Sequence, residues 1–266
     1  MSTFKIVLAY DGTDFVGWQR QASGLSIQGV LEDALRTLDD RDVTVTGAGR
    51  TDAGVHALAQ VASFSLERAI DRDTLVRALN AHLPETIRVL SAEEVPPTFN
   101  PRRARTKTYR YRIRNGPVLS PFERRYAWHV VSALDVGAMD AAARRLEGRH
   151  DFAAFQTVGS DVVTTERTIF SSLILRPAQD ERSTNTLVVS LSTHEPLIVY
   201  EITGDGFLRH MVRAIVGTLV EIGRGRRPAD WIDNVLASRD RSAAGSTVPA
   251  AGLFLVRVDY GDAPCE

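Results

Sequence analysis

The chain has 266 residues and a single cysteine, Cys265, next to the last residue. One thiol cannot form an internal disulfide, which agrees with a reducing cytoplasm. It also cannot supply the two or more thiolates of a cysteine-based zinc site. The six histidines are scattered and form no H-E-x-x-H pair. We therefore expect a cytoplasmic protein without a metal site.

Long apolar runs and several catalytic motifs are missing too. No run approaches the length that crosses a bilayer, and the N-terminal residues resemble a strand rather than a signal peptide, so we expect no membrane association. The sequence contains no G-x-x-x-x-G-K-[ST], no G-x-G-x-x-G after a strand and no G-x-S-x-G. Nucleotide hydrolysis, nicotinamide chemistry and serine hydrolysis therefore lack their usual signatures.

The charge of the chain is nearly balanced overall but concentrated locally. The net charge is −1 at pH 7, which alone does not suggest a nucleic-acid partner. However, seven positive charges and no acidic residue fall between Arg102 and Arg114. Such an excess is typical of a phosphate-binding surface. The alternative is a solvated face. The seven cations are Arg102, Arg103, Arg105, Lys107, Arg110, Arg112 and Arg114.

Apolar periodicity predicts an α+β chain in two halves, residues 1–105 and 106–266. In the first half, Ser26 is placed to cap an amphipathic helix, and a second helix is expected from about Asp71 to Ala81. In the second half, helices are expected at 136–147, 206–222 and 231–237. Strands are expected at 167–175, 186–192, 198–203 and 253–258. A polar turn is expected at 179–185 and a mobile loop at 238–252.

The basic segment 106–114 alternates with period two and predicts a strand. Tyr109 and Tyr111 would face one side, and the arginines between them the other. Alternating aromatic residues usually belong to a core. The alternative is a stacking surface for a nucleobase beside arginines that bind phosphates.

A glycine-rich loop from Gly47 to His56 presents one carboxylate, Asp52, beside one guanidinium, Arg50. Glycines let the backbone turn sharply. A neighbouring cation favours the ionised carboxylate that a nucleophile or general base requires. The alternative is a turn aspartate that accepts a hydrogen bond from its own backbone. His56, at the end of this loop, is expected to be a hydrogen-bonded structural histidine, and the alternative is a ligand contact.

The segment 206–222 is apolar nearly all round, which predicts a buried helix. Arg209 lies near its expected start, and Arg213 lies four residues later on the same side. Burying an unpaired guanidinium costs on the order of several kcal/mol. Arg213 therefore needs an anionic partner, which could be a structural acid, Asp52 or a substrate phosphate.

Four segments, in this order, resemble the signatures of the A-type tRNA pseudouridine synthases. They are YDG with GWQRQ at residues 10–12 and 17–21, GRTDAGVH at 49–56, KTYRY at 107–111 and FLRHMVRAIVG at 207–217. The resemblance runs from about residue 5 to residue 260. It implies an α+β fold whose two similar halves share a central, largely antiparallel sheet, with helices on one side and an RNA-binding cleft on the other.

The same resemblance implies a function. Members isomerise uridine to pseudouridine in the anticodon stem-loop of tRNA, at positions 38, 39 and/or 40, as homodimers without a cofactor or metal. Asp52 would be the nucleophile acting on a flipped-out uridine, and Arg213 its partner. Tyr109 would contact the target base, and Arg50 would hold the RNA backbone or help keep the base flipped out. Further RNA contacts are expected from Gln19, Arg20, Arg102, Arg103, Arg110 and Arg112.

The chain departs from the family pattern at residues 99–103, FNPRR, where members often carry a run like FHARF. That departure bears on local RNA contacts rather than on the catalytic set. One alternative is a non-catalytic RNA-binding protein that uses the basic segment 102–114, but it leaves Asp52 and Arg213 without a purpose. Another is a zinc deaminase, against which the single cysteine argues.

Overall fold

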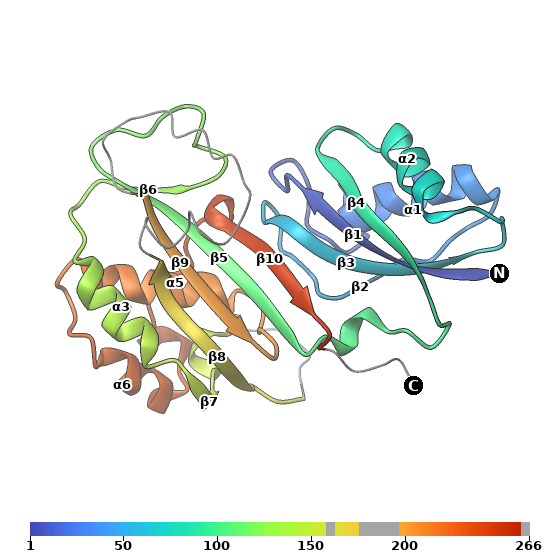
Figure 1. Cartoon of the computed structure of the whole chain (residues 1–266). Helices are drawn as coiled ribbons and strands as arrows, with labels where there is room; N and C mark the ends of the chain where they lie inside the picture. The colour runs from blue at the N-terminus through green and yellow to red at the C-terminus, as the bar shows by residue number, and fades with distance from the viewer. Residues whose placement is uncertain (158–162, 176–196, 262–266) are drawn as a thin grey trace. The chain divides into compact units, whose positions relative to one another are not determined.

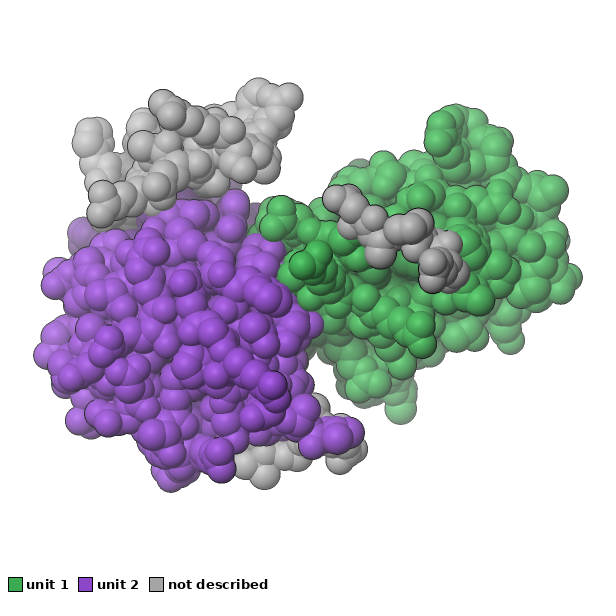
Figure 2. All heavy atoms as spheres, turned by 60° about the horizontal axis from the view of Figure 1, so that its bottom comes forward, with its two compact units in different colours: residues 1–107, 254–266 green, residues 108–253 purple. Residues whose placement is uncertain are grey.

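The computed structural model describes residues 1–157, 163–175 and 197–261. The chain forms two compact units, one of residues 1–107 with 254–266 and one of residues 108–253 (Figures 1 and 2). Each unit has its own strands, helices and buried core. No helix in the described ranges has the length and apolar character needed to cross a membrane.

The first unit contains a sheet in the order β4-β1-β3-β10, with β2 beside β3. Strand β1 (Ser2–Tyr10) lies antiparallel between β3 (His56–Leu66) and β4 (Ile87–Val95), and β2 (Thr46–Gly47) is antiparallel to β3. Strand β10 (Leu253–Asp259), from the end of the chain, pairs parallel with β3, so that Phe254 lies opposite His56. The C-terminal strand β10 therefore belongs to the same sheet as the N-terminal strand β1.

Two helices in this unit form where local signals predict them. Helix α1 (Ile27–Asp39) is capped by Ser26, whose side chain accepts a hydrogen bond from the Gly29 amide. Helix α2 (Arg72–His82) is capped by Asp71, which accepts from two amides of the first turn, and packs against β4. The short helix η1 (Pro101–Arg103) begins at an Asn100 cap. The predictions for α1 and α2 are confirmed.

The second unit contains strands in the order β5-β9-β8-β7, with β6 beside β5 (Figure 1). Strands β7 (Gly148–Asp151), β8 (Glu166–Leu175) and β9 (Leu197–Gly204) are successively antiparallel, whereas β6 (Trp128–Val130) runs parallel to β5 (Thr106–Asn115). Helix α3 (Val136–Arg144) packs on β8 and on α5 (Met211–Gly223), and α6 (Trp231–Ser238) follows. Sheets with separate helices in both units confirm the α+β class.

Helix α5 begins later than its apolar pattern predicts. His210, at its N-cap, has a left-handed backbone with φ of 62°, and its Nδ1 lies 2.7 Å from Thr157 Oγ1. Residues 206–210 therefore precede the helix, because that conformation cannot continue into an α-helical turn. Arg209 is outside α5, and the prediction that it shares a helical face with Arg213 is wrong.

Two other expectations concern loops. The segment predicted as a mobile loop at 238–252 contains the short helices η3 (Arg241–Ala243) and η4 (Ala250–Gly252), and its backbone packs directly on α5. The predicted polar turn at 179–185 and strand at 186–192 lie outside the described residues.

Candidate active site

The loop that carries Asp52 connects β2 to β3 in the first unit. Asp52 is half-buried and Arg50 is exposed. Hydrogen bonds from β3 fix the approach to this loop: the Ala48 amide donates to the Val61 carbonyl at 2.8 Å, and Gln60 Nε2 donates to the Gly49 carbonyl at 2.9 Å. The carboxylate is thus presented by a loop whose base is part of the sheet.

The N-terminal segment 10–18 supports the same loop from a second direction. The Trp18 amide donates to the Thr51 carbonyl at 3.0 Å, and Tyr10 Oη lies 2.8 Å from Thr51 Oγ1. On the other side of Asp52, the Gly54 amide donates to the Phe15 carbonyl at 3.3 Å. The residues on both sides of Asp52 are therefore held by the segment between β1 and α1, which rigidifies the carboxylate's backbone.

Close approach of these backbones explains the glycines. A Cβ on Gly12 would overlap the carbonyl of Val55, and a Cβ on Gly17 would lie 2.6 Å from the Thr51 carbonyl oxygen. Gly17 also has φ of +108°, a conformation that L side chains rarely adopt. The sequence indicated turns here, but only the structure shows that these turns press against the loop of Asp52.

His56 closes this loop from within the core of the first unit. Its ring is buried, stacks on Phe254 with 4.6 Å between centroids, and accepts a hydrogen bond from the Gly12 amide at Nδ1, 3.1 Å away. Asp11 Oδ1 also lies 3.1 Å from Nδ1, and the two groups would form an ion pair only with a protonated ring. His56 therefore ties the Asp11-Gly12 turn to the end of the Asp52 loop.

Two further predicted residues lie in the second unit. Tyr109 on β5 is only 8% exposed, and its ring meets Phe207 edge to face with 5.0 Å between centroids. Arg213 is half-buried in the first turn of α5, a helix that is otherwise nearly all buried. Its Nε donates to the carbonyl of Val248 at 2.7 Å. Both residues are thus held by aromatic or backbone partners of their own unit.

Tyr111 lies close enough to Arg213 to feel its charge. It is fully buried, and its hydroxyl donates to the Pro249 carbonyl at 2.7 Å. Burial raises the pKa of Tyr111 far above its usual value, and the positive charge of Arg213 opposes that rise only in part. Tyr111 therefore remains a neutral hydrogen-bond donor at physiological pH.

Two arginines expected to contact RNA, and one other arginine of the basic segment, are paired with carboxylates of the protein. Arg110 donates from two nitrogens to Glu201 Oε2, at 2.9 and 3.1 Å, and Arg114 forms an ion pair with Glu123. Arg20 pairs with Glu32 at 2.8 Å and with a second helix carboxylate at 3.1 Å. These partners lie outside the basic segment, so inspection of that segment alone could not reveal them.

The other expected RNA contacts differ in exposure. Arg102 and Arg103 are exposed on η1, and the Arg102 amide donates to the Asn100 side chain at 3.0 Å. Gln19 donates from its amide to Gln28 Oε1 at 2.7 Å. Arg112 is half-buried. The FNPRR departure from the family pattern is therefore a capped turn that presents two arginines to solvent.

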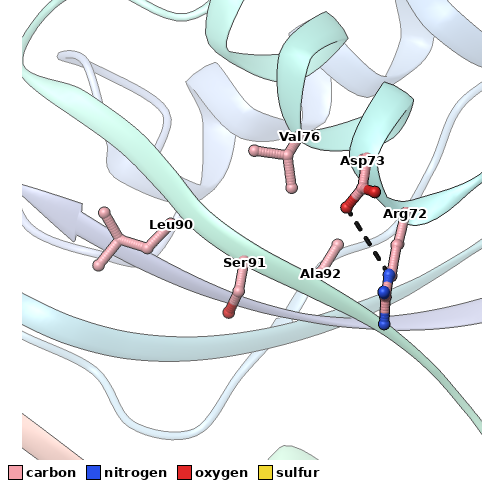
Figure 3. Close-up of a pocket in the computed structure, with 6 residues that line it drawn as sticks. All are labelled: Arg72, Asp73, Val76, Leu90, Ser91 and Ala92. Carbon is pink, nitrogen blue, oxygen red and sulfur yellow. Dashed lines mark ion pairs between the residues drawn. The ribbon is translucent and has the colours of Figure 1, made fainter.

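A surface hollow of about 420 Å³ lies in the first unit between α2 and β4. Figure 3 shows Val76 and Asp73 on the helix side and Leu90 and Ser91 on the strand, with Arg72 paired to Asp73 at 3.6 Å. None of the predicted site residues lines it. Within the described ranges, no cluster of His, Cys, Asp and Glu side chains could hold a metal ion.

Comparison with known proteins identifies the family. A family profile described as tRNA pseudouridine synthase matches residues 6–102 and 142–261. Proteins named tRNA pseudouridine synthase A are similar over almost the whole chain. The protein from Pelobacter propionicus is 44% identical over 98% of this chain and 100% of its own length. The protein from Myxococcus xanthus is 44% identical over 99% of this chain and 94% of its own length. The one from Solibacter usitatus is 46% identical over 98% of this chain and 100% of its own length.

Among solved structures, the archaeal box H/ACA sRNP Nop10–Cbf5 complex matches 82% of this chain and 44% of that chain, with a TM-score of 0.34 and 10% identity. The assignment rests on the sequence relatives and the profile. The chain belongs to the tRNA pseudouridine synthase family and is an isomerase that acts on uridine in tRNA.

Proposed function

We propose that this enzyme converts uridine to pseudouridine in the anticodon stem-loop of tRNA, at positions 38, 39 and/or 40, with Asp52 as the nucleophile. The observation that carries the proposal is the support of Asp52: a half-buried carboxylate on a loop whose flanking residues are hydrogen-bonded to β3 and to the segment 10–18. A nucleophile needs this combination of access and fixed direction.

The reaction rearranges bonds within one nucleotide. The N1–C1′ glycosidic bond breaks, the uracil turns, a C5–C1′ bond forms, and the hydrogen on C5 leaves as a proton while N1 gains one. A carboxylate can assist by a covalent intermediate, as in retaining glycosidases. Attack of Asp52 on C1′, attack on C6 and proton removal from C2′ are three routes that all require an ionised, aimed carboxylate.

Arg213 and Tyr109 are assigned supporting roles. Arg213 would pair with Asp52 and favour its charged form, because an adjacent cation stabilises a carboxylate. Tyr109 would provide an aromatic wall for the target base, and its contact with Phe207 supports a fixed ring orientation. Arg50, exposed beside Asp52, would hold the RNA backbone or the flipped base.

The target uridine lies in a folded stem-loop and must be flipped out, at a cost of roughly a few kcal/mol. Phosphate contacts from exposed cations such as Arg102 and Arg103 would offset this cost. We further propose that the enzyme acts in the cytoplasm as a homodimer, by its membership of the family.

The test uses anticodon-arm RNA that carries tritium at uridine C5. We expect release of tritium without added cofactor or metal, and loss of that release when uridines 38, 39 and 40 are replaced by cytidine. Release that is unchanged in the substituted RNA would contradict the assigned positions. Ammonia release would indicate a deaminase instead.

Asp52→Asn tests the nucleophile. We expect turnover to be abolished while tRNA affinity stays within about twofold, because binding depends on cations rather than on this carboxylate. Asp73→Asn is the matched control, since Asp73 is an exposed carboxylate of the same unit in the hollow between α2 and β4, and it should leave both quantities unchanged. Turnover that survives in Asp52→Asn, or affinity that falls as much as rate, would refute the assignment.

A further inference from the structure

Residues 241–249, here called the brace segment, lie against α5 at van der Waals distance. A Cβ on Gly217 of the helix would overlap the carbonyl of Ser246, and a Cβ on Gly245 would lie 2.5 Å from the Thr218 amide nitrogen. The backbones of the helix and the brace segment therefore approach each other so closely that neither Gly217 nor Gly245 has room for a side chain. Such a close contact leaves the brace segment little freedom to shift along the helix.

A buried hydroxyl joins the two backbones at this point. Thr218 is 0% exposed. Its Oγ1 accepts a hydrogen bond from the Gly245 amide at 2.8 Å and donates to the Ala214 carbonyl at 2.9 Å. Both capacities of the hydroxyl are used, so Thr218 acts as a staple between the helix and the brace segment.

The brace segment is also fixed to itself and to β5. Arg241 donates to the Gly245 carbonyl at 2.8 Å and to Thr247 Oγ1 at 2.9 Å, and the Pro249 carbonyl accepts from Tyr111 at 2.7 Å. Between these anchors lies Val248. Its carbonyl accepts from Arg213 Nε at 2.7 Å, and its amide donates to the Arg213 carbonyl at 3.4 Å.

We propose that the brace segment, stapled by Thr218, sets the orientation of the Arg213 guanidinium for catalysis, and that Thr218 is a positioning residue. A bond at Nε fixes the plane of the guanidinium. The orientation of that plane sets the direction of the two terminal amino groups. These groups bind a carboxylate with two parallel hydrogen bonds. The inference rests on the role proposed for Arg213, and it adds residues that would act through Arg213.

The test replaces the hydroxyl without changing the size of the side chain. In Thr218→Val, the buried Gly245 amide loses its acceptor and the brace segment loses its staple. We expect the single-turnover rate constant on tRNA to fall about tenfold or more, because a misoriented catalytic group reacts poorly, while tRNA affinity stays within twofold. Thr218→Ser keeps the hydroxyl and should recover most of the rate.

Two further variants distinguish a positioning role of Thr218 from a general loss of stability. Ser172→Ala removes another fully buried hydroxyl of the same unit, which lies on β8 and 2.8 Å from Tyr200 Oη. It should lower the melting temperature without changing the rate. If Thr218→Val prevents folding, Arg241→Met, which removes the clamp on Gly245 and Thr247, should lower the rate in the same way.

The double variant Thr218→Val with Arg213→Ala separates the two proposals. If the brace acts through Arg213, Thr218→Val should have no further effect once Arg213 is absent. A rate unchanged in Thr218→Val, or one that falls by the same factor with and without Arg213, would overturn the positioning role. A rate unchanged in Arg213→Ala alone would instead refute the catalytic assignment of Arg213.

Discussion

Tyr109 is buried in the second unit, and its contact with a target base stays a prediction. Its alternation on β5 predicted either a core ring or a stacking surface, and its ring is 8% exposed and edge-on to Phe207. The edge-on contact with Phe207 helps to fix the orientation of the Tyr109 ring. We expect the ring, more than the hydroxyl, to matter for the target base.

Substitution of Tyr109 tests that distinction. We expect Tyr109→Phe to keep a turnover within about tenfold of the wild type, because the ring and its contact with Phe207 remain. Tyr109→Ala removes the ring and should reduce turnover by about 100-fold or more, since it also leaves a cavity beside Phe207. Single-turnover rates on anticodon-arm RNA measure both. Equal rates in the two variants would show that stacking is not the function of this side chain.

At the scale of elements, strand β5 carries the basic pattern that suggested RNA. The predicted alternation is confirmed, with Tyr109, Tyr111 and Ile113 buried and the arginines between them half-buried. Yet Arg110 is held by Glu201 and Arg114 by Glu123. Much of the charge on β5 therefore stabilises the second unit, whereas Arg102 and Arg103 on η1 remain exposed.

This difference predicts how tRNA affinity depends on salt. Each phosphate contact contributes about 0.7–0.9 to the slope of log affinity against log salt concentration. We expect Arg102→Gln with Arg103→Gln to reduce the slope by about one to two, and Arg110→Gln to change it by less than half as much. Arg110→Gln should instead lower stability, because Glu201 loses its partner. Filter-binding titrations from low to high salt measure the slopes, and a larger change in Arg110→Gln would contradict this ranking.

Elements governed by local signals were predictable, and those governed by distant contacts were not. Ser26 and Asp71 mark the starts of α1 and α2 in the sequence, because an N-cap residue acts within the first turn of its helix. The start of α5 depends on His210, whose partner Thr157 lies 53 residues earlier. The segment 238–252 looked like a loose loop, because the fit of Gly217 against Ser246 cannot be inferred from either glycine or serine alone.

At the scale of the molecule, the proposed catalytic residues divide between the two units. Asp52 and Arg50 belong to the first, and Tyr109 and Arg213 to the second. The first unit includes the last strand of the chain, since β10 pairs with β3 and Phe254 stacks on His56. The sheet behind Asp52 is therefore completed only when almost the whole chain is present, a non-local contact that slows folding.

Buried tyrosines in both units link the stability of the molecule to alkaline pH. Burial raises the pKa of Tyr10 to about 12, although hydrogen bonds with Thr51 and Gln60 lower it in part. Burial also raises the pKa values of Tyr111, Tyr200 and Tyr260 above the usual range. A tyrosine with a raised pKa in the fold favours folding while it is protonated. This stability is fully present below the unfolded pKa of about 10 and is lost as the pH rises through the folded pKa.

Tyr10→Phe isolates the contribution of the residue that supports the Asp52 loop. Below pH 10 the variant should be less stable than the wild type by a constant amount, because it lacks the Thr51 hydrogen bond. Between pH 10 and about 12 the wild type should lose roughly 2–3 kcal/mol through Tyr10, a loss that the variant cannot show. The two stability curves should therefore converge with rising pH in urea denaturation and then cross, because this loss exceeds the roughly 1 kcal/mol that one hydrogen bond contributes. Curves that stay parallel to pH 12 would mean that the Tyr10 hydroxyl ionises as easily in the folded chain as in the unfolded one.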